Sequence, residues 1–243
     1  MRVTLNHKAE FKEVLKNYVP GPEALEVLSR IPLVILLGVS GSGRNTIINH
    51  LVETGKYKFI VSDTTRPPKV RNGELEQDGV QYYFRSEEEV LDDLRQGKYL
   101  EAELIHNQQV SGTSIRELVQ VADSNKIPIN EVDMGGTDNI ISVKPDTQFF
   151  FVVPLSYDEW MRRLTGREQM SDAELDNRLT TAVRVIEKGL AEEHFTFVIN
   201  DDSADSAVRI DEQINGGRNI GHHDEARAVT EQLLSDIKKH HQV

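Results

Sequence analysis

Short apolar runs alternate along this chain with longer segments that have the hydrophobic period of an α-helix. The first run covers residues 31–37, and later ones cover 58–61, 127–132, 148–153 and 195–199. The first run is uninterrupted, which is typical of a strand buried on both faces, and the later runs predict further strands. Strands that alternate with helices predict an α/β fold, in which helices cover both faces of a parallel sheet to form three layers.

Four of the helical segments begin with a serine that is followed three residues later by a glutamate. This spacing fits the capping box, in which each of the two side chains bonds the backbone of the other residue at the start of a helix. The pairs are Ser86 and Glu89, Ser114 and Glu117, Ser156 and Glu159, and Ser171 and Glu174. We therefore expect helices to begin directly after these serines.

Residues 62–113 depart from the alternation of strands and helices. They are polar, contain several glycines and include the aromatic group Tyr82-Tyr83-Phe84. This composition predicts a small inserted subdomain with mixed or antiparallel strands.

The two ends of the chain also differ from its centre. Amphipathic segments before the breaker cluster Pro20-Gly21-Pro22 and after it predict an N-terminal helical extension over residues 1–30. We expect the main domain to cover residues 31–214. A loop and a final amphipathic helix would then occupy residues 215–243, with the helix over about 225–239.

Composition narrows the possible classes of function. The 243 residues carry 28 Lys and Arg against 40 Asp and Glu, and the net charge of −12 argues against nucleic-acid and membrane partners. Cysteine is absent, which excludes disulfides, thiolate catalysis and cysteine-bound metals. The start of the chain lacks a signal-peptide core, and no apolar run approaches the ~20 residues that span a bilayer. We expect a cytoplasmic protein, and its oligomeric state stays open.

The first predicted strand leads into a glycine-rich turn, Gly38-Val39-Ser40-Gly41-Ser42-Gly43-Arg44-Asn45-Thr46, and then into a helix. Such a turn directs several backbone N–H groups at one point, and the helix dipole adds to its affinity for phosphate. In the usual P-loop a lysine and then a serine or threonine follow the last glycine. Here Arg44 keeps the positive charge in planar form. Asn45 offers an amide oxygen to Mg²⁺ or to a water in its shell, a task that Thr46 could share.

A second motif follows the second predicted strand. The sequence Ser62-Asp63-Thr64-Thr65-Arg66-Pro67-Pro68-Lys69 precedes Gly73-Glu74, Asp78-Gly79 and Tyr82-Tyr83-Phe84. Together with the glycine turn, this order of motifs resembles the guanylate kinase family. The resemblance covers about residues 33–202, and its further motifs are Glu101, Gly112-Thr113, Val132-Asp133-Met134, Arg163-Leu164, Gly166-Arg167, Asn177-Arg178-Leu179 and 198–202.

The resemblance implies a site for GMP, the phosphoryl acceptor. Arg66 would pair with the GMP phosphate, because a guanidinium matches phosphate oxygens in a fork. The second cation would be Lys69 or, equally, Arg71, and Tyr82 would donate its hydroxyl to the same phosphate. A carboxylate that accepts from N1–H and the 2-amino group selects guanine, since a wrong base leaves that charge unpaired. The residues implied at the guanine edge are Ser62, Glu101, Thr113 and Asp133.

The resemblance also implies a lid over about residues 163–178 that closes on the donor phosphates. Arg163 and Arg167 are four residues apart, so on a helix they share a face. Arg178 follows in the next helical segment. These three arginines and Arg44 are the catalytic groups that the family pattern implies.

The donor nucleotide is ATP by the same resemblance. Residues 38 and 40–46 of the glycine turn would hold its phosphates, and Asn200 would contact its base. Asn45 and Glu131 would hold the cofactor Mg²⁺ through water. Glu131 takes the place of an aspartate of the family, and Gly135 that of a glutamine.

These assignments predict transfer of the γ-phosphoryl group of ATP to GMP, giving ADP and GDP. Two alternatives stay open. One is a non-catalytic guanylate-kinase-like domain that binds a protein partner, because Arg44, Asn45 and Ser111 depart from the family pattern as such domains do. The other is a related kinase with a different acceptor, which would not need Glu101 and Asp133.

Residues outside these motifs receive simpler interpretations. We interpret His222-His223 and His240-His241 as loop and tail residues that bind no metal, because no acidic residues lie at a suitable spacing. Trp160 and the aromatic run Phe149-Phe150-Phe151 are expected in the core.

Overall fold

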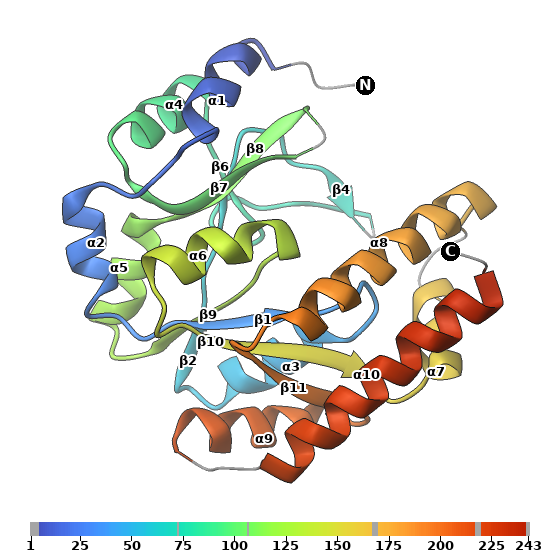
Figure 1. Ribbon diagram of the computed structural model, residues 1–243. Helices are drawn as coiled ribbons and strands as arrows, with labels where there is room; N and C mark the ends of the chain where they lie inside the picture. The colour runs from blue at the N-terminus through green and yellow to red at the C-terminus, as the bar shows by residue number, and fades with distance from the viewer. Residues whose placement is uncertain (1–4, 72, 106, 167–169, 217–219, 242–243) are drawn as a thin grey trace. The chain divides into compact units, whose positions relative to one another are not determined.

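The computed structural model describes residues 5–71, 73–105, 107–166, 170–216 and 220–241 (Figure 1). The chain forms two compact units, and each combines segments that are distant in the sequence. The first unit consists of residues 1–33, 58–128 and 135–147. The second unit consists of residues 34–57, 129–134 and 148–243.

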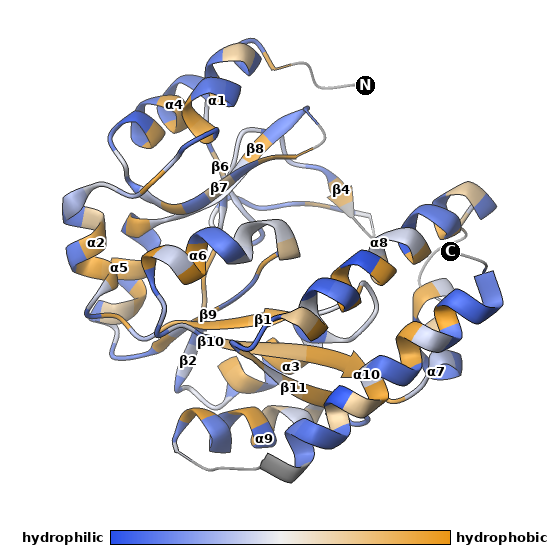
Figure 2. Cartoon of the chain, in the orientation of Figure 1, coloured by the Kyte–Doolittle hydropathy of each residue, from blue (hydrophilic) through white to orange (hydrophobic). Residues whose placement is uncertain are grey.

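A five-stranded sheet has the strand order β11–β10–β1–β9–β2. Its strands are β1 (Val34–Leu37), β2 (Tyr57–Phe59), β9 (Ile127–Glu131), β10 (Gln148–Pro154) and β11 (Phe195–Asn200). β1 pairs in parallel with β10 and with β9, and β10 pairs in parallel with β11. Figure 2 shows that β1 and β10 are hydrophobic along their length, and every residue of β1 is buried. The predicted parallel sheet is confirmed, with apolar runs as the mark of strands buried on both faces.

Five helices of the second unit are α3 (Arg44–Glu53), α7 (Tyr157–Thr165), α8 (Asp172–Ala191), α9 (Ser203–Ile214) and α10 (Ile220–His241). α3 packs on α9, and α10 packs on β11 and α8. Among the described residues, no helix is both long and apolar enough to cross a lipid bilayer.

The last helix begins earlier than the sequence pattern predicts. α10 includes His222 and His223, which we had expected in a loop. The Nε2 atom of His222 accepts a hydrogen bond from the backbone of Ile199, and Nδ1 of His223 accepts one from the backbone of Phe197. These bonds join the first turns of α10 to β11, so tertiary contacts extend a helix that local propensity leaves undefined.

The first unit contains a four-stranded sheet in the order β6–β3–β8–β7. Its strands are β3 (Asp63–Thr64), β6 (Tyr83–Phe84), β7 (Tyr99–Ile105) and β8 (Gln109–Ser114). β3 is parallel to β6 and antiparallel to β8, while β7 and β8 are antiparallel. The predicted mixed sheet is therefore confirmed. The strands β4 (Val70–Arg71) and β5 (Glu74–Leu75) form a separate antiparallel pair.

The helices of the first unit are α1 (Lys8–Leu15), α2 (Pro22–Leu28), α4 (Glu87–Arg95), α5 (Ile115–Asp123) and α6 (Thr137–Val143), and a 3₁₀ turn, η1 (Met134–Gly136), precedes α6. The predicted caps are confirmed in both units. The side chains of four serines each accept a bond from the backbone N–H of the glutamate three residues on; they are Ser86, Ser114, Ser156 and Ser171. The pair Ser86 and Glu89 completes the capping box.

The N-terminal segment is part of the core of the first unit. Phe11 of α1 is fully buried in a cluster with apolar residues of α4, β7 and β8. The hydroxyl of Tyr18 donates to the carbonyl oxygen of Tyr99 at 2.9 Å and accepts from its N–H at 2.8 Å. These two hydrogen bonds attach the segment after α1 to strand β7 of the sheet.

Candidate nucleotide site

The glycine turn joins β1 to α3 in the conformation that a phosphate cradle requires. Gly38, Gly41 and Gly43 have φ values of 139°, 85° and 93°, a region that residues with a side chain rarely adopt. A Cβ atom at Gly38 would lie 2.3 Å from the carbonyl oxygen of Val152. One at Gly43 would lie 2.2 Å from Nδ2 of Asn200. The three glycines are therefore required by backbone conformation, and two of them also by close packing.

Two side chains from other elements fasten the turn. Trp160 of α7 is fully buried, as predicted for the core, and its indole N–H donates to the carbonyl oxygen of Ser40 at 2.8 Å. The amide of Asn200, at the end of β11, donates to the carbonyl oxygen of Ser42 at 2.6 Å. Both bonds use carbonyl groups of the turn, and the N–H of Ser42 donates within the turn to the carbonyl oxygen of Val39 at 3.1 Å. The predicted contact of Asn200 with the donor base stays a prediction.

The hydroxyl of Ser42 is an unpaired polar group in the turn. Ser42 is 0% exposed, and within the described part of the chain its Oγ has no hydrogen-bond partner. An orphaned buried hydroxyl is costly and uncommon, so it needs an explanation such as a ligand. Its position in the turn fits the predicted role of this segment in holding phosphate.

The two unusual residues of the turn both contact Glu131. Asn45 satisfies both ends of its amide when its nitrogen faces Glu131, and this nitrogen then donates to the two carboxylate oxygens at 3.1 and 2.7 Å. Nε of Arg44 lies 3.4 Å from Oε2 of the same carboxylate. Glu131 ends β9, beside β1 in the sheet, so the two side chains predicted to hold Mg²⁺ through water, Asn45 and Glu131, lie in contact. Thr46 is exposed.

The predicted lid arginines are paired with protein groups. Nε of Arg163 donates to Glu159 at 2.7 Å, and Nη2 donates to the carbonyl oxygen of Asn200 at 3.1 Å. Arg178 donates to Glu174, one turn earlier on α8, at 2.6 Å. Hydrogen bonds from Arg162 and then Arg163 hold the pKa of Glu159 at about 2, well below its usual range. Arg167 lies outside the described residues.

Arg66, the predicted phosphate-binding arginine, lies in the first unit and is 3% exposed. Its Nη1 and Nη2 donate to the two carboxylate oxygens of Glu76 at 2.5 and 3.0 Å. The guanidinium also lies over the ring of Tyr82, with Cζ 4.8 Å from the ring centroid. Thus Arg66 and Tyr82 are brought together as predicted, and Glu76 joins them.

Two residues are predicted as the second cation for the acceptor phosphate, Lys69 and Arg71, and the choice between them stays a prediction. The backbone N–H of Lys69 donates to Glu76 at 2.9 Å, and its side chain is exposed. The backbone of Arg71 belongs to β4, and its side chain lies outside the described residues. Ser111, which stands where the family pattern has a tyrosine, donates its hydroxyl to Thr64 at 2.8 Å.

Two of the predicted guanine contacts meet across a pair of strands. Glu101 of β7 is opposite Thr113 of β8, and Oε1 of Glu101 accepts the backbone N–H of Thr113 at 3.0 Å. Ser62 lies in the same unit, directly before β3, and Asp133 lies in the second unit. The bond from Thr113 fixes one oxygen of Glu101, which orients the carboxylate for recognition of a ligand.

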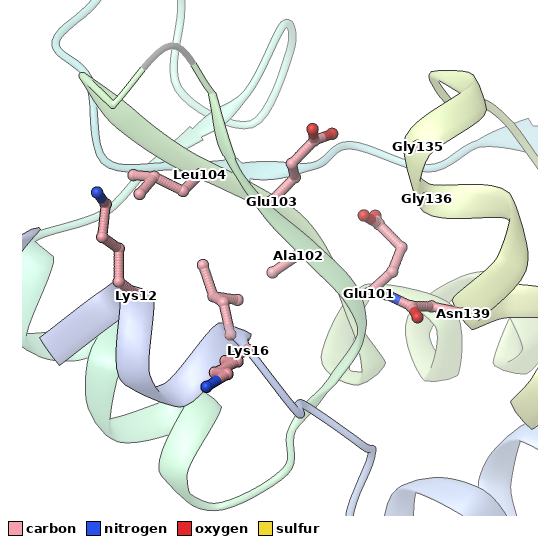
Figure 3. Close-up of a pocket in the computed structure, with 10 residues that line it drawn as sticks. Lys12, Lys16, Glu101, Ala102, Glu103, Leu104, Gly135, Gly136 and Asn139 are labelled. Carbon is pink, nitrogen blue, oxygen red and sulfur yellow. The ribbon is translucent and has the colours of Figure 1, made fainter. Parts of the chain in front are cut away.

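Glu101 also lines a pocket of about 390 Å³ in the first unit (Figure 3). Glu101 and Glu103 extend from one face of β7 toward Gly135 and Gly136. A Cβ atom on Gly136 would lie 3.6 Å from Glu101, and one on Gly135 would lie 3.5 Å from Glu103. The opposite wall comes from α1, with Lys12 and Lys16 labelled in Figure 3. The two glycines therefore leave space beside both carboxylates.

Sequence reasoning missed Glu76, the buried partner of Arg66. The family pattern directed attention to Glu74, which is exposed in β5. Glu76 follows that strand, and because the turn between β4 and β5 reverses the chain, its side chain lies against Arg66. No local pattern marks it, because the pairing depends on the length of that turn.

A parallel sheet whose first strand ends in a glycine cradle at a helix N-terminus defines the class of P-loop nucleotide-binding proteins. Comparison with known proteins narrows the class. The family model described as guanylate kinase matches residues 30–214. The chain belongs to the guanylate kinase family, which confirms the resemblance found in its motifs.

Individual relatives agree with this assignment. A guanylate kinase of Clostridioides difficile is 32% identical over 188 residues, which cover 77% of this chain and 88% of the relative. One of Corynebacterium glutamicum is 35% identical over 184 residues, covering 75% and 93%. The crystal structure of guanylate kinase from Anaplasma phagocytophilum has a TM-score of 0.55, with coverage of 87% and 95%. At 23% identity, that structure supports the fold alone.

Proposed function

We propose that this protein transfers the γ-phosphoryl group of ATP to the phosphate of GMP, giving ADP and GDP. The observation that carries this proposal is the pairing of Glu101 with the backbone of Thr113. It presents an oriented carboxylate at the position where the family motif reads guanine. A carboxylate here accepts from two guanine N–H groups and leaves adenine, which offers an acceptor at N1, unpaired.

The donor ATP binds the glycine turn of the second unit. The backbone of residues 40–46 and the buried hydroxyl of Ser42 bind its phosphates, while Trp160 and Asn200 hold the turn through its carbonyl groups. Arg44 supplies a positive charge at the start of α3. This arrangement is pre-organised, because the indole of Trp160 and the amide of Asn200 fix the carbonyl groups of the turn before a ligand binds.

The acceptor GMP binds the first unit through its phosphate at one end and its base at the other. Arg66, kept in place by Glu76, and the hydroxyl of Tyr82 bind its phosphate, with Lys69 or Arg71 as the second cation. The residues of this chain that the family pattern assigns to its base are Ser62, Glu101, Thr113 and Asp133.

The chemical step needs positioning more than proton transfer. The attacking oxygen of the GMP phosphate is already anionic near neutral pH, so no general base is required. Catalysis then comes from alignment of the two phosphates and from positive charge on the transferring group. Arg44, Arg163, Arg167 and Arg178 supply that charge. For Arg163 this requires exchange of its bonds to Glu159 and Asn200 for bonds to phosphate.

Mg²⁺ ordinarily accompanies ATP and neutralises charge on its phosphates. The side chains predicted to hold it, Asn45 and Glu131, do not fit direct coordination, because the amide nitrogen faces the carboxylate and Arg44 stands beside it. Within the described ranges, no three His, Asp or Glu side chains gather closely enough to hold a metal ion. A water-mediated contact of Asn45 and Glu131 with the metal stays a prediction.

An assay of ATP against a panel of nucleoside monophosphates tests the proposal. We expect turnover with GMP and little with AMP, CMP or UMP. Turnover with another acceptor would support the related kinase. No turnover and no GMP binding would support the non-catalytic binding module.

Paired variants test the base contact. Glu101→Gln should raise the KM for GMP at least about tenfold, because it removes a hydrogen-bond partner that carries charge. Glu103→Gln is the matched control, since it changes the same chemical group two residues along the same strand face. Equal effects of the two variants would contradict the assignment of Glu101.

A further inference from the structure

The residues at which the glycine turn departs from the usual P-loop form one connected group. Arg44 replaces the lysine, Asn45 replaces the hydroxyl residue, and both contact the carboxylate of Glu131. Two independent losses of function would not be expected to leave both residues in contact with the same carboxylate. We therefore interpret Arg44 and Asn45 as a joint replacement of the usual P-loop residues that depends on Glu131.

Strand pairing explains why Glu131 can reach both residues. β1 and β9 are parallel neighbours, and Leu36 of β1 is opposite Glu131. Because parallel strands end at the same edge of a sheet, Glu131 emerges beside the turn that follows β1. Its own N–H is fixed by Oδ1 of Asn130 at 2.8 Å. The carboxylate thus starts from a rigid position.

The environment makes the ion pair stronger than a typical surface pair. The side chain of Arg44 is 16% exposed and that of Glu131 is 30% exposed. Partial burial lowers the local dielectric, which strengthens the attraction between the two charges. Asn45 donates to both oxygens of Glu131, so the carboxylate is held on two sides.

The ion pair between Nε of Arg44 and Glu131, at 3.4 Å, limits the orientations of the guanidinium and leaves its terminal nitrogens outside that contact. The guanidinium is planar, so a fixed Nε sets the plane and direction of the fork that can bind phosphate oxygens. A lysine needs no such support, because its ammonium group is compact and donates in three directions. Replacing lysine by arginine in this turn therefore calls for a neighbouring group that fixes the side chain.

We propose that Glu131 is a positioning residue that, with Asn45, orients Arg44 toward the β- and γ-phosphates of ATP. This inference rests on the proposed function insofar as it takes ATP to be the ligand of the turn. It assigns Glu131 a task that does not require a metal ion. The alternative is that Glu131 acts on the nucleotide through Mg²⁺.

The two roles predict opposite changes in the binding of metal-free ATP. Removing a negative charge near a triphosphate by itself tightens binding, because it lessens repulsion. If Glu131 positions Arg44, however, Glu131→Gln should weaken binding of ATP in excess EDTA by about tenfold, within the range of coupling between residues in contact. Isothermal titration calorimetry without GMP measures this affinity.

A double-mutant cycle isolates the contact. In the Arg44→Ala background, Glu131→Gln should change the affinity for metal-free ATP by less than about twofold, since there is no guanidinium left to orient. Glu131→Asp keeps the charge but shortens the side chain, so it should weaken binding as Glu131→Gln does. Glu53→Gln is the matched control, because it removes the same charge from the far end of α3 and should leave binding unchanged.

The outcomes are decisive in both directions. Unchanged or tighter binding of metal-free ATP to Glu131→Gln, with weaker binding only when Mg²⁺ is present, would overturn the positioning role. An equal loss in the wild-type and Arg44→Ala backgrounds would overturn it as well. Thermal melting of each variant separates these results from unfolding. Because GMP is absent, failure to phosphorylate GMP would refute the proposed function without altering the result of this cycle.

Discussion

Glu76 holds Arg66 through both of its carboxylate oxygens, and the two side chains are 2% and 3% exposed. A guanidinium bound in this way cannot rotate freely, and the ring of Tyr82 covers one of its faces. The pair therefore fixes the orientation of the Arg66 guanidinium. The desolvation of two charges is offset only while both partners are present.

Removal of one partner should therefore be costly. We expect Glu76→Ala to lower the free energy of unfolding by about 3–5 kcal/mol, because it leaves the Arg66 charge buried without its partner. Glu74→Ala, two residues away and exposed, should change stability by less than about 0.5 kcal/mol. Urea denaturation of both variants measures the difference, and similar losses in the two would show that the pair has no special role.

The milder variant Glu76→Gln tests the functional side of the same pair. It keeps the shape and one acceptor but loses the charge, so Arg66 should be less well oriented. We expect the KM for GMP to rise severalfold while the Kd for ATP stays unchanged, because the proposed function assigns Arg66 to GMP and not to ATP. A parallel loss of ATP binding would indicate a general disturbance of the fold.

Two glycines with positive φ, one at each end of α3, allow the effect of backbone strain to be distinguished from the effect of close packing in the glycine turn. Gly43 and Gly55 have φ values of 93° and 77°. A Cβ at Gly43 would lie 2.2 Å from Nδ2 of Asn200, whereas nothing lies within 4 Å of one at Gly55. Both alanine variants should lose about 1–2 kcal/mol of stability through strain. Only Gly43→Ala should also weaken ATP binding, at least about tenfold, because the clash displaces the anchor of the turn.

Calorimetry of ATP binding to the two alanine variants checks this expectation. Gly55→Ala is a demanding control, since it reproduces the strain at the other end of α3 without the clash. Equal affinities for ATP would mean that the contact between Asn200 and the turn does not shape the phosphate cradle.

The sequence predicted those features that are encoded locally. The run at β1, the glycine turn and the serine caps depend on neighbours along the chain, and each was confirmed. Glu76 was missed because its pairing with Arg66 depends on the turn between β4 and β5. The start of α10 was missed for the same reason, since His222 is held by a strand that ends more than twenty residues earlier. Long-range partners leave no periodic signal in the sequence.

The N-terminal segment should matter for the stability of the first unit. The hydroxyl of Tyr18 bonds both the N–H and the carbonyl oxygen of Tyr99. Tyr18→Phe leaves both backbone groups without this partner, so we expect a loss of about 1–3 kcal/mol in the free energy of unfolding. Burial raises the pKa of Tyr18 to about 12, so this contribution should be constant between pH 6 and 9. A loss that varied with pH in this range would contradict it.

The attachment of α10 should weaken in mild acid. His222 and His223 accept backbone N–H bonds from β11 at 3.3 and 3.1 Å. A protonated ring nitrogen cannot accept, so protonation of His222 would remove its bond from Ile199. Burial, and then the positive charge of Arg209, lower the pKa of His222 in the folded protein below 6.5, and the carboxylates of Glu225 and Asp201 oppose this shift. The unfolded chain therefore binds the proton more readily. This stabilisation is complete above pH 6.5 and is lost as the pH falls through the folded pKa.

His222→Gln tests this dependence, because its amide oxygen can accept the bond from Ile199 at any pH. We expect the unfolding free energy of the wild type to fall between pH 7 and 5 by about 1 kcal/mol more than that of the variant, the value of one hydrogen bond. His50→Gln, on the surface of α3, is the matched control and should follow the wild type. Parallel pH profiles for the wild type and His222→Gln, measured by urea denaturation, would show that the bond to β11 does not depend on the neutral ring.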